Sequence, residues 1–233
     1  MNPEKNWGQF ERLRPAQIES IKRETPVAYV PFGAIEWHSY HAPTGLDCHK
    51  SHGLLRELAS VVGGLVLPPL YVGTDSIKPF KGFKQTIEHS RETVRLLASE
   101  ILEQLADEGF RVIVLLTGRY SQGHQDMNAE AAAEFRERHP DIGLWSGGDN
   151  IPLEGKFQMN HAARGETSFQ LYFEPDTVDL SLLPSDRVAT LDDDGVWGDD
   201  PREATREEGE RMVHAFIEYM EPRVRELLRE SAR

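Results

Sequence analysis

Short apolar runs separated by amphipathic stretches are the main pattern along this chain. The runs at 27–32, 65–72 and 111–117 are apolar at nearly every position, as in strands that are buried on both faces of a sheet. Two weaker runs, 142–145 and 168–173, complete the predicted strands. Because such runs are typical of parallel strands covered by helices, the pattern predicts a layered α/β sheet.

The amphipathic stretches between these runs predict the helices. The clearest covers 90–108, where apolar residues recur three and four positions apart and so share one helix face. Further helices are expected at 50–60, 126–137 and 203–228. The last is expected to be interrupted or bent near Pro222, because proline has no backbone N–H to donate inside a helix.

The whole chain, residues 1–233, is expected to form a single domain. A chain of 233 residues is long enough to bury a sizeable core, and neither an internal repeat nor a low-complexity tract divides it. The aspartate-rich segment 191–201 is predicted to be an exposed loop. Nothing in the sequence marks a domain boundary.

Charge and cysteine content narrow the partners and the compartment. The formal net charge of −13, from 39 acidic and 26 basic residues, repels nucleic acid and anionic membrane surfaces, so neither is expected as a partner. Cys48 is the single cysteine and cannot form an internal disulfide, and residues 1–5 lack the apolar core of a signal peptide. We therefore predict a cytoplasmic protein. No apolar run reaches the roughly 18 residues of a membrane span.

A carboxylate and an imidazole follow the first strong strand run. Glu36 and His38 are two residues apart, so in an extended segment both side chains point the same way. The segment falls where ligands of open parallel sheets bind, beyond the carboxyl end of a strand. With Asp47, which can complete or bridge the site, these ligands suit zinc, manganese or iron. The alternative is that Glu36 and His38 are loop residues that bond to neighbouring backbone.

Four of the nine histidines fall between residues 38 and 52, and this clustering favours a site. His49 and His52 are three residues apart on a predicted helix and are interpreted as part of a solvated face or as residues that surround the ligands. Cys48 is interpreted as a small packed residue, because no basic environment that would activate a thiol can be read around it.

Residues 33–47 carry a more specific signal. The run Gly-Ala-Ile-Glu-Trp-His, followed by His-Ala-Pro and an aspartate, resembles the signature of the creatininase (creatinine amidohydrolase-like) family. By this resemblance Glu36, His38 and Asp47 are metal ligands, and the aspartate bridges two ions in members that hold two. His41 matches a second family histidine near the pocket.

The run 160–168, Asn-His-Ala-Ala-Arg-Gly-Glu-Thr-Ser, resembles the family's His-Ala-Gly-x-x-Glu-Thr-Ser motif, with Ala163 in place of the usual glycine. The resemblance implies that His161 assists catalysis and that Glu166 lies at the metal centre or the reacting group. A glutamate beside an activated water can act as general base, and a histidine can protonate the leaving nitrogen or hold the substrate. From the residues alone, Glu-Thr-Ser would simply cap a helix.

The chain departs from the family pattern after the run 111–117. The family usually has a histidine ligand there, in Asn-Gly-His, and this chain has Arg119 in Thr-Gly-Arg-Tyr-Ser-Gln. A guanidinium stays protonated and has no lone pair for a cation. Three interpretations remain open. Arg119 replaces the charge of one ion and holds an anionic substrate or an oxyanion, or the chain is a catalytically silent member of the family. In the third, His124 substitutes as the metal ligand. Because His124 lies at the start of a predicted helix, a surface position is the more expected one for it.

The resemblance implies a three-layer α/β/α sandwich with a mostly parallel sheet, usually assembled as an oligomer, so a homo-oligomer is expected. It also implies a hydrolase that cleaves a C–N bond of a small-molecule amide or cyclic amide through metal-activated water. The cofactor would be a divalent ion, zinc or manganese with iron as a further option, in one or two copies, with Glu166 among its ligands. Candidate substrate-binding residues are Arg119, Tyr120, Trp37 and His41. The alternatives are a non-catalytic binding protein with this fold and a metal-dependent hydrolase or lyase of a sugar-derived substrate.

Overall fold

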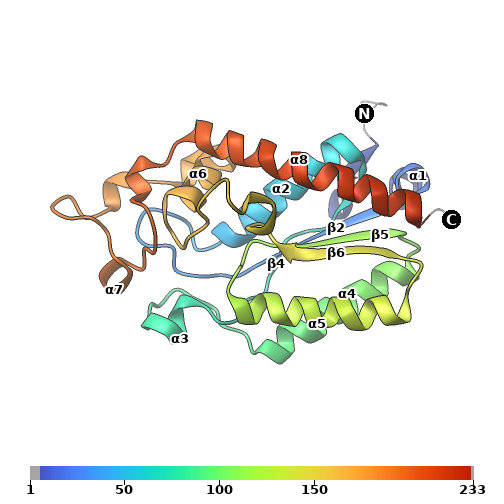
Figure 1. Ribbon diagram of the computed structural model, residues 1–233, viewed down its shortest axis with the longest axis horizontal. Coiled ribbons are helices and arrows are strands. Elements are labelled where there is room, and N and C mark those ends of the chain that lie inside the picture. The colour runs from blue at the N-terminus through green and yellow to red at the C-terminus, as the bar shows by residue number, and fades with distance from the viewer. Residues whose placement is uncertain (1–5, 232–233) are drawn as a thin grey trace.

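A six-stranded, all-parallel sheet runs through the middle of the protein (Figure 1). The computed structural model of the chain describes residues 6–231. The strands are β1 (Trp7–Gln9), β2 (Val27–Gly33), β3 (Gly64–Val66), β4 (Leu70–Tyr71), β5 (Val112–Thr117) and β6 (Gly143–Gly148). They lie in the order β1, β3, β2, β5, β6, and β4 pairs with the end of β2.

Helices cover both faces of this sheet, which confirms the predicted three-layer α/β/α sandwich with a parallel sheet. The helices are α1 (Pro15–Glu24), α2 (Leu46–Val62), α3 (Ile77–Lys81), α4 (Arg91–Asp107), α5 (Gln122–Arg138), α6 (Arg164–Phe173), α7 (Leu191–Asp194) and α8 (Arg206–Glu230). In Figure 1, α2, α6 and α8 lie on one side of the sheet, and α4 and α5 lie on the other. Within residues 6–231, no helix is both long and apolar enough to cross a membrane.

The central strand β2 shows why its sequence is apolar throughout. Every residue of β2 is buried. Val27 and Tyr29 pack in a cluster with side chains of α2 and α8, whereas Ala28 and Val30 pack in a second cluster with side chains of α4 and α5. Because successive side chains of a strand point to opposite faces, a strand between two helical layers needs apolar residues at both.

One predicted strand is wrong. The run 168–173 forms the second half of α6, not a strand. Its rings at Phe169 and Phe173 are four residues apart, so both lie on one face of a helix, and their centroids are 6.1 Å apart. A short apolar run has no period long enough to separate a buried helix from a buried strand.

Three further expectations are corrected. The run 65–72 is divided into β3 and β4, since the prolines at 68–69 cannot donate to a strand ladder. Of the two outcomes expected at Pro222, an interruption or a bend, the interruption is wrong, because helix α8 continues across this residue. The segment 191–201 is not wholly an exposed loop, because it contains α7 and because Asp194 is buried, with its carboxylate paired to Arg187.

The carboxyl ends of β2, β5 and β6 meet at one edge of the sheet, where the first turns of two helices approach them. Asp47 stands in the first turn of α2, and Glu166 stands in the first turn of α6. Gly118 follows β5 directly, and a Cβ atom there would clash with the backbone oxygen of Asp47. The absence of a side chain at residue 118 therefore lets α2 begin against the end of β5.

Candidate metal centre and active site

His38, Asp47 and Glu166 form a buried group at this edge, called here the inner cluster. The three side chains come from the segment after β2, from α2 and from α6, and none is more than 1% exposed. His38 Nε2 lies 3.3 Å from Asp47 Oδ1 and 3.6 Å from Glu166 Oε2. One nitrogen and two carboxylate oxygens thus face one another within the reach of a single ion.

The hydrogen bonding of His38 determines which of its nitrogens is available. Its Nδ1 lies 3.0 Å from the backbone oxygen of Glu36, and a carbonyl only accepts, so Nδ1 carries the proton. Nε2 is buried and has no hydrogen-bond partner. Burial lowers the pKa of His38, but Asp47 and Glu166 outweigh burial and raise it to about 9. The cluster therefore favours a positive charge at Nε2, either a proton or a metal ion.

The two carboxylates of the inner cluster are held by other bonds. Asp47 Oδ2 accepts from the backbone N–H of Ala34 at 3.3 Å, and Glu166 Oε2 accepts from that of Ala162 at 2.7 Å. Burial tends to raise the pKa of both groups, but His38 lowers that of Asp47 far below the usual range, and Lys50 lowers that of Glu166. Both groups are therefore ionised and oriented at neutral pH.

Glu36 is engaged by an arginine. Its Oε2 accepts from Arg119 Nη1 at 2.6 Å, and its Oε1 accepts from the backbone N–H of Ile77 at 2.5 Å. Arg119 Nη2 donates to the backbone oxygen of Asp75 at 2.5 Å. Burial raises the pKa of Glu36 to about 7 although the Arg119 charge opposes it. The structure thus places Glu36 beside His38, as the sequence implied, but with both of its oxygens occupied.

His161 lies between the inner cluster and Glu36. Its ring centroid is 4.5 Å from that of His38. Its Nε2 donates to the backbone oxygen of Trp37 at 2.8 Å, so Nδ1 keeps a free lone pair, 3.7 Å from Glu36 Oε2. Burial, helped by the His38 charge, lowers the pKa of His161 to about 3, so the ring is neutral at pH 7.

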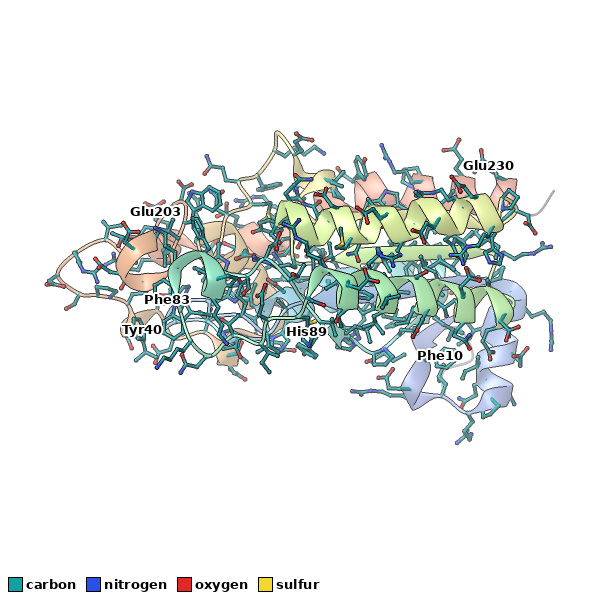
Figure 2. The ribbon with its side chains drawn as sticks, turned by 90° about the horizontal axis from the view of Figure 1, so that it is seen from below. Phe10, Tyr40, Phe83, His89, Glu203 and Glu230 are labelled. Carbon is teal, nitrogen blue, oxygen red and sulfur yellow. The ribbon has the colours of Figure 1, made fainter. Side chains whose placement is uncertain are left out.

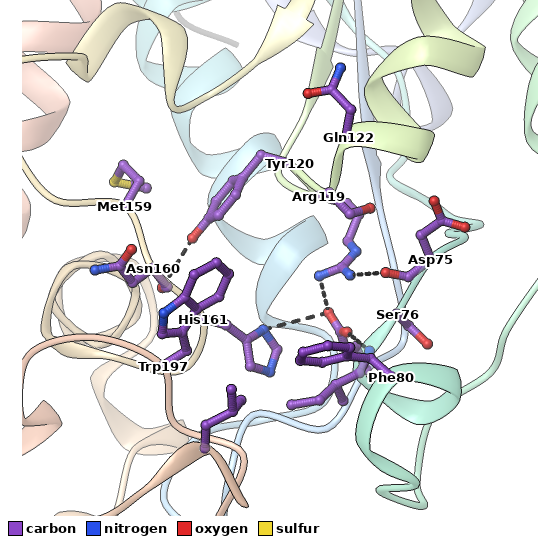
Figure 3. A pocket seen from close by; sticks show the side chains of 14 residues that line it. Asp75, Ser76, Phe80, Arg119, Tyr120, Gln122, Met159, Asn160, His161 and Trp197 are labelled. Atoms are coloured by element: carbon purple, nitrogen blue, oxygen red, sulfur yellow. Dashed lines mark hydrogen bonds and ion pairs between the residues drawn. The ribbon is translucent and has the colours of Figure 1, made fainter.

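A cavity of about 470 Å3 opens beside this group (Figure 3). Glu36, Arg119 and His161 line it. Most of the remaining wall area is apolar and comes from Ile77, Phe80, Met159, Leu191 and Trp197. Polar side chains from the segments at 75–76, 120–122 and 160 also line it. Because His161 lines the cavity and packs beside His38, the cavity ends one side chain away from the inner cluster.

The four candidate substrate-binding residues divide into two pairs. Arg119 and Tyr120 line the cavity, and the Tyr120 hydroxyl donates to the backbone oxygen of Asn160 at 3.0 Å. Trp37 and His41 are not among the described residues that line it. His41 Nε2 lies 2.9 Å from the Thr167 hydroxyl.

Trp37 has a packing environment of its own. Its ring stacks on Phe83 at 5.6 Å, meets Tyr40 edge-on at 4.9 Å, and donates from Nε1 to the backbone oxygen of Asp194. Tyr40 and Phe83 lie at the same end of the molecule, opposite the end that carries Glu230 (Figure 2). Trp37 therefore connects the segment after β2 with α7 and the loop after α3.

Lys50 and Asp149 belong to the site, and the sequence reasoning missed both. Lys50 and Asp149 are fully buried, and Lys50 Nζ lies 2.5 Å from Glu166 Oε1 and 3.3 Å from Asp149 Oδ2. The ammonium also lies 4.3 Å from the centre of the Tyr120 ring. Two signals were present in the sequence: Lys50 is three residues after Asp47 on one helix, and Asp149 directly follows a strand.

The remaining candidates lie around the site. His124 is fully buried rather than at the surface, and it is in neither of the described groups that could hold an ion. It is buried because α5 presents this face to the sheet. His49 is partly buried and lies 3.3 Å from the Glu174 carboxylate, while His52 is also partly buried. Cys48 is a packed residue, as expected, and burial raises the pKa of its thiol.

The fold and the site define a parallel α/β/α protein with a buried imidazole and carboxylate cluster next to a small cavity. The sequence profile of the creatininase family, described as creatinine amidohydrolase, matches residues 11–223. The chain therefore belongs to the creatininase family.

Individual relatives agree over most of their length. Creatinine amidohydrolase from Pseudomonas putida is 25% identical over 231 residues, which cover 86% of this chain and 89% of that protein. Two solved creatininase structures, one described as Mn and one a glutamate-to-glutamine mutant described as Zn-Zn type, each superpose with a TM-score of 0.78. Each is 22% identical, and the match covers 96% of this chain and 98% of the other. The family thus includes zinc and manganese proteins with this fold.

Proposed function

We propose that the protein is a metal-dependent hydrolase that cleaves the C–N bond of a small amide or cyclic amide. The observation that carries the proposal is His38 Nε2, a buried nitrogen without a short hydrogen bond that faces two ionised carboxylates and so favours a cation there. A polar atom buried in this way costs free energy unless an ion or another group completes it. Family membership and the neighbouring cavity support the same conclusion.

The inner cluster fits a divalent ion. One imidazole nitrogen and two carboxylate oxygens are the donor set that suits zinc, manganese and iron, with zinc or manganese favoured because solved relatives are described with those metals. The bond from His38 Nδ1 to a backbone carbonyl orients the ring in the way that metal-binding histidines commonly use. A divalent ion held by His38, Asp47 and Glu166 would polarise a substrate carbonyl and lower the pKa of a bound water.

The other residues of the site divide the remaining tasks. Glu166 has one oxygen on Lys50 and the other on Ala162, so it acts as an ion ligand and not as a mobile general base. His161 is neutral, and its Nδ1 lone pair accepts a hydrogen bond from a substrate N–H. Hydrolysis of an amide adds water across the C–N bond, and His161 would take the proton that the water gives up and pass it to the leaving nitrogen beside it.

The cavity favours a small, weakly charged substrate. Its walls are mostly apolar, and its one lining arginine is already paired with Glu36. A paired guanidinium attracts an anion less strongly than a free one, because the adjacent carboxylate cancels much of its field. The structure therefore supports Arg119 as the ion-pair partner of Glu36 more strongly than as the residue that binds an anionic substrate.

The test is metal-dependent turnover of a panel of small amides. The protein is stripped with a chelator, reloaded with Zn²⁺ or Mn²⁺, and assayed on creatinine, simple lactams and formamides by release of amine or carboxylate. We expect turnover only after reloading, and its loss in His38→Ala together with loss of the bound ion. His214→Ala, at an exposed histidine, is the matched control and keeps both.

Two other results would each point to a different function. If the chelated protein binds neither ion, the hydrolase proposal fails and a binding protein with a creatininase fold replaces it. If an ion binds but no amide reacts, while sugar-derived substrates do, the chemistry belongs to a hydrolase or lyase of such compounds. A cytoplasmic location and assembly as a homo-oligomer are further parts of the proposal, to be checked by fractionation and by light scattering.

A further inference from the structure

We propose that Lys50 is a built-in cation that takes the place of a second metal ion, so that the site binds a single divalent ion at the inner cluster. This inference rests on the proposed function, since it presumes that His38, Asp47 and Glu166 hold an ion. It concerns a side chain that neither touches the cavity nor belongs to the family signature described above.

The surroundings of Lys50 are those that a bound cation has. The side chain is fully buried, and its ammonium lies against one oxygen each of Glu166 and Asp149, at 2.5 and 3.3 Å. The face of the Tyr120 ring lies on a further side, 4.3 Å away. Lysine is a compact point charge, which lets it occupy a place between carboxylates. Because it is not exposed to the cavity, its charge acts on the ligands and not on the substrate.

The balance of buried charge leaves room for one divalent ion. Four described carboxylates lie in or beside the inner cluster, and two fixed cations accompany them. The carboxylates are Glu36, Asp47, Asp149 and Glu166, and the cations are Lys50 and Arg119. With all four carboxylates ionised and His38 neutral, as when an ion is bound, the two uncompensated negative charges equal the charge of one divalent ion. A second ion would leave two uncompensated positive charges, and burying unpaired charge is strongly unfavourable.

The geometry of the ligands agrees with this balance. Two groups of described residues could each hold an ion: the inner cluster, and Glu36 with His38 and His161. Both need the same free nitrogen, His38 Nε2, because Nδ1 already bonds to a backbone carbonyl. In the second group the Arg119 guanidinium lies 2.6 Å from the Glu36 oxygen that an ion would take. Only in the inner cluster are the carboxylate oxygens that face His38 Nε2, Asp47 Oδ1 and Glu166 Oε2, not paired with a described lysine or arginine.

Lys50 also sets the direction of a ligand. It bonds Glu166 Oε1 and leaves Glu166 Oε2 on the side of His38 Nε2, 3.6 Å away. Lys50 is accordingly a positioning residue: one carboxylate oxygen serves the internal ammonium and the other serves the ion. An ion shared between Glu166 and Asp149 would have to displace the ammonium.

The first experiment counts ions in the full chain. Chelated protein is titrated with Mn²⁺, bound manganese per chain is measured by elemental analysis, and frozen samples are examined by electron paramagnetic resonance. We expect one Mn²⁺ per chain and the six-line spectrum of an isolated ion. Two ions per chain with a spin-coupled spectrum would overturn the inference and leave the proposed function intact. No bound ion would instead remove the proposed function.

The second experiment removes the internal cation. In Lys50→Met we expect a second Mn²⁺ per chain, because Glu166 and Asp149 then face each other without a positive charge. The double variant Lys50→Met/Asp149→Asn removes a carboxylate together with the cation and should return to one ion. Lys156→Met, at an exposed lysine, is the control and should match the unaltered protein.

Two results in the variants would contradict the inference. One is a single ion in Lys50→Met, and the other is two ions in the double variant. If Lys50→Met does not fold, the ion count of the unaltered protein and of the charge-balanced double variant decides the matter.

Discussion

The inner cluster and the polar wall of the cavity contain the same kinds of side chain but differ in what their bonds leave free. In the inner cluster, His38 presents a nitrogen with no partner to two carboxylates. In the wall, both oxygens of Glu36 accept hydrogen bonds, and Arg119 supplies the opposite charge. The comparison teaches that carboxylates and histidines alone do not define a metal site. What decides it is whether a fixed cation is already paired with the carboxylate oxygen that faces the histidine nitrogen, as Arg119 is with Glu36 Oε2 but no described cation is with Glu166 Oε2.

The largest expected effect lies at the cation of the inner cluster. Lys50→Met leaves Glu166 and Asp149 buried without a cation, so we expect the free energy of unfolding to fall by about 3–5 kcal/mol. Urea denaturation followed by circular dichroism measures this. Lys50→Met/Asp149→Asn should recover part of the loss, since it also removes one of the stranded charges. A variant as stable as the unaltered chain would show that the two carboxylates are neutral in the folded protein.

The second largest expected effect on stability comes from a steric change at the border of the inner cluster. In Gly118→Ala the new Cβ meets the backbone oxygen of Asp47, so α2 must move. We expect a loss of about 3 kcal/mol in unfolding free energy, and a fall in Mn²⁺ affinity of about 10-fold or more because a ligand is displaced. Isothermal titration measures the affinity.

Gly109→Ala separates steric clash from backbone strain in that experiment. Gly109 has a φ of +80° with open space around it, so its substitution introduces strain alone. We expect a loss of about 1 kcal/mol there and no change in affinity. If Gly118→Ala binds Mn²⁺ as tightly as the unaltered protein, the start of α2 is not held against the end of β5, and the steric explanation is wrong.

A substitution in the polar wall of the cavity should lower the free energy of unfolding by less. Arg119→Met leaves the Glu36 carboxylate with one backbone donor, and the expected loss in unfolding free energy is about 2 kcal/mol. Water in the adjacent cavity can solvate the exposed carboxylate, which is why the effect is smaller than at Lys50. Thermal melts measure this loss. Arg119→Lys keeps the charge but not both contacts of the guanidinium, so its stability should lie between those of Arg119→Met and the unaltered protein. A larger loss at Arg119 than at Lys50 would reverse the comparison.

The smallest effect concerns pH and lies outside both regions. Burial lowers the pKa of His124 to about 4, against about 6.5 in an unfolded chain. The unfolded state therefore binds the proton first, and the stability contributed by neutral His124 is present above about pH 6.5 and is lost as pH falls toward 4. We expect His124→Gln to reduce the loss between pH 7.5 and 4.5 by about 1–2 kcal/mol. His214→Gln, at an exposed histidine, should leave the slope unchanged.

Much of the fold could be predicted because its signals are local. The apolar runs of β2 and β5 and the periodic helix α4 were placed nearly at their observed bounds. The run 168–173 failed because six residues cannot show whether their period is that of a strand or a helix. Helix α1 and the short strand β1 carry weak apolar patterns, and tertiary contacts with the rest of the sheet stabilise them.

The site residues follow the same rule: those within a sequence motif could be predicted, and those brought in by tertiary contacts could not. Motif resemblance brought His38, Asp47 and Glu166 together, and the structure places these three side chains in one cluster. The partners of Arg119 could not be predicted, since Glu36 and Asp75 reach it from distant segments. Lys50 was overlooked because lysine on a helix is usually solvated, and only the three-dimensional structure shows that its helix turns this face inward.

The two helices that begin at the inner cluster have a consequence for the protein without its ion. Asp47 and Glu166 each stand in the first turn of a helix, α2 and α6, whose N-terminal N–H groups carry a partial positive charge. A chelator can extract an ion, but it cannot remove these dipoles or the Lys50 ammonium. The ligands should therefore stay ionised and aligned in the stripped protein. Reloading should then proceed without refolding, as fast as the cavity admits the ion.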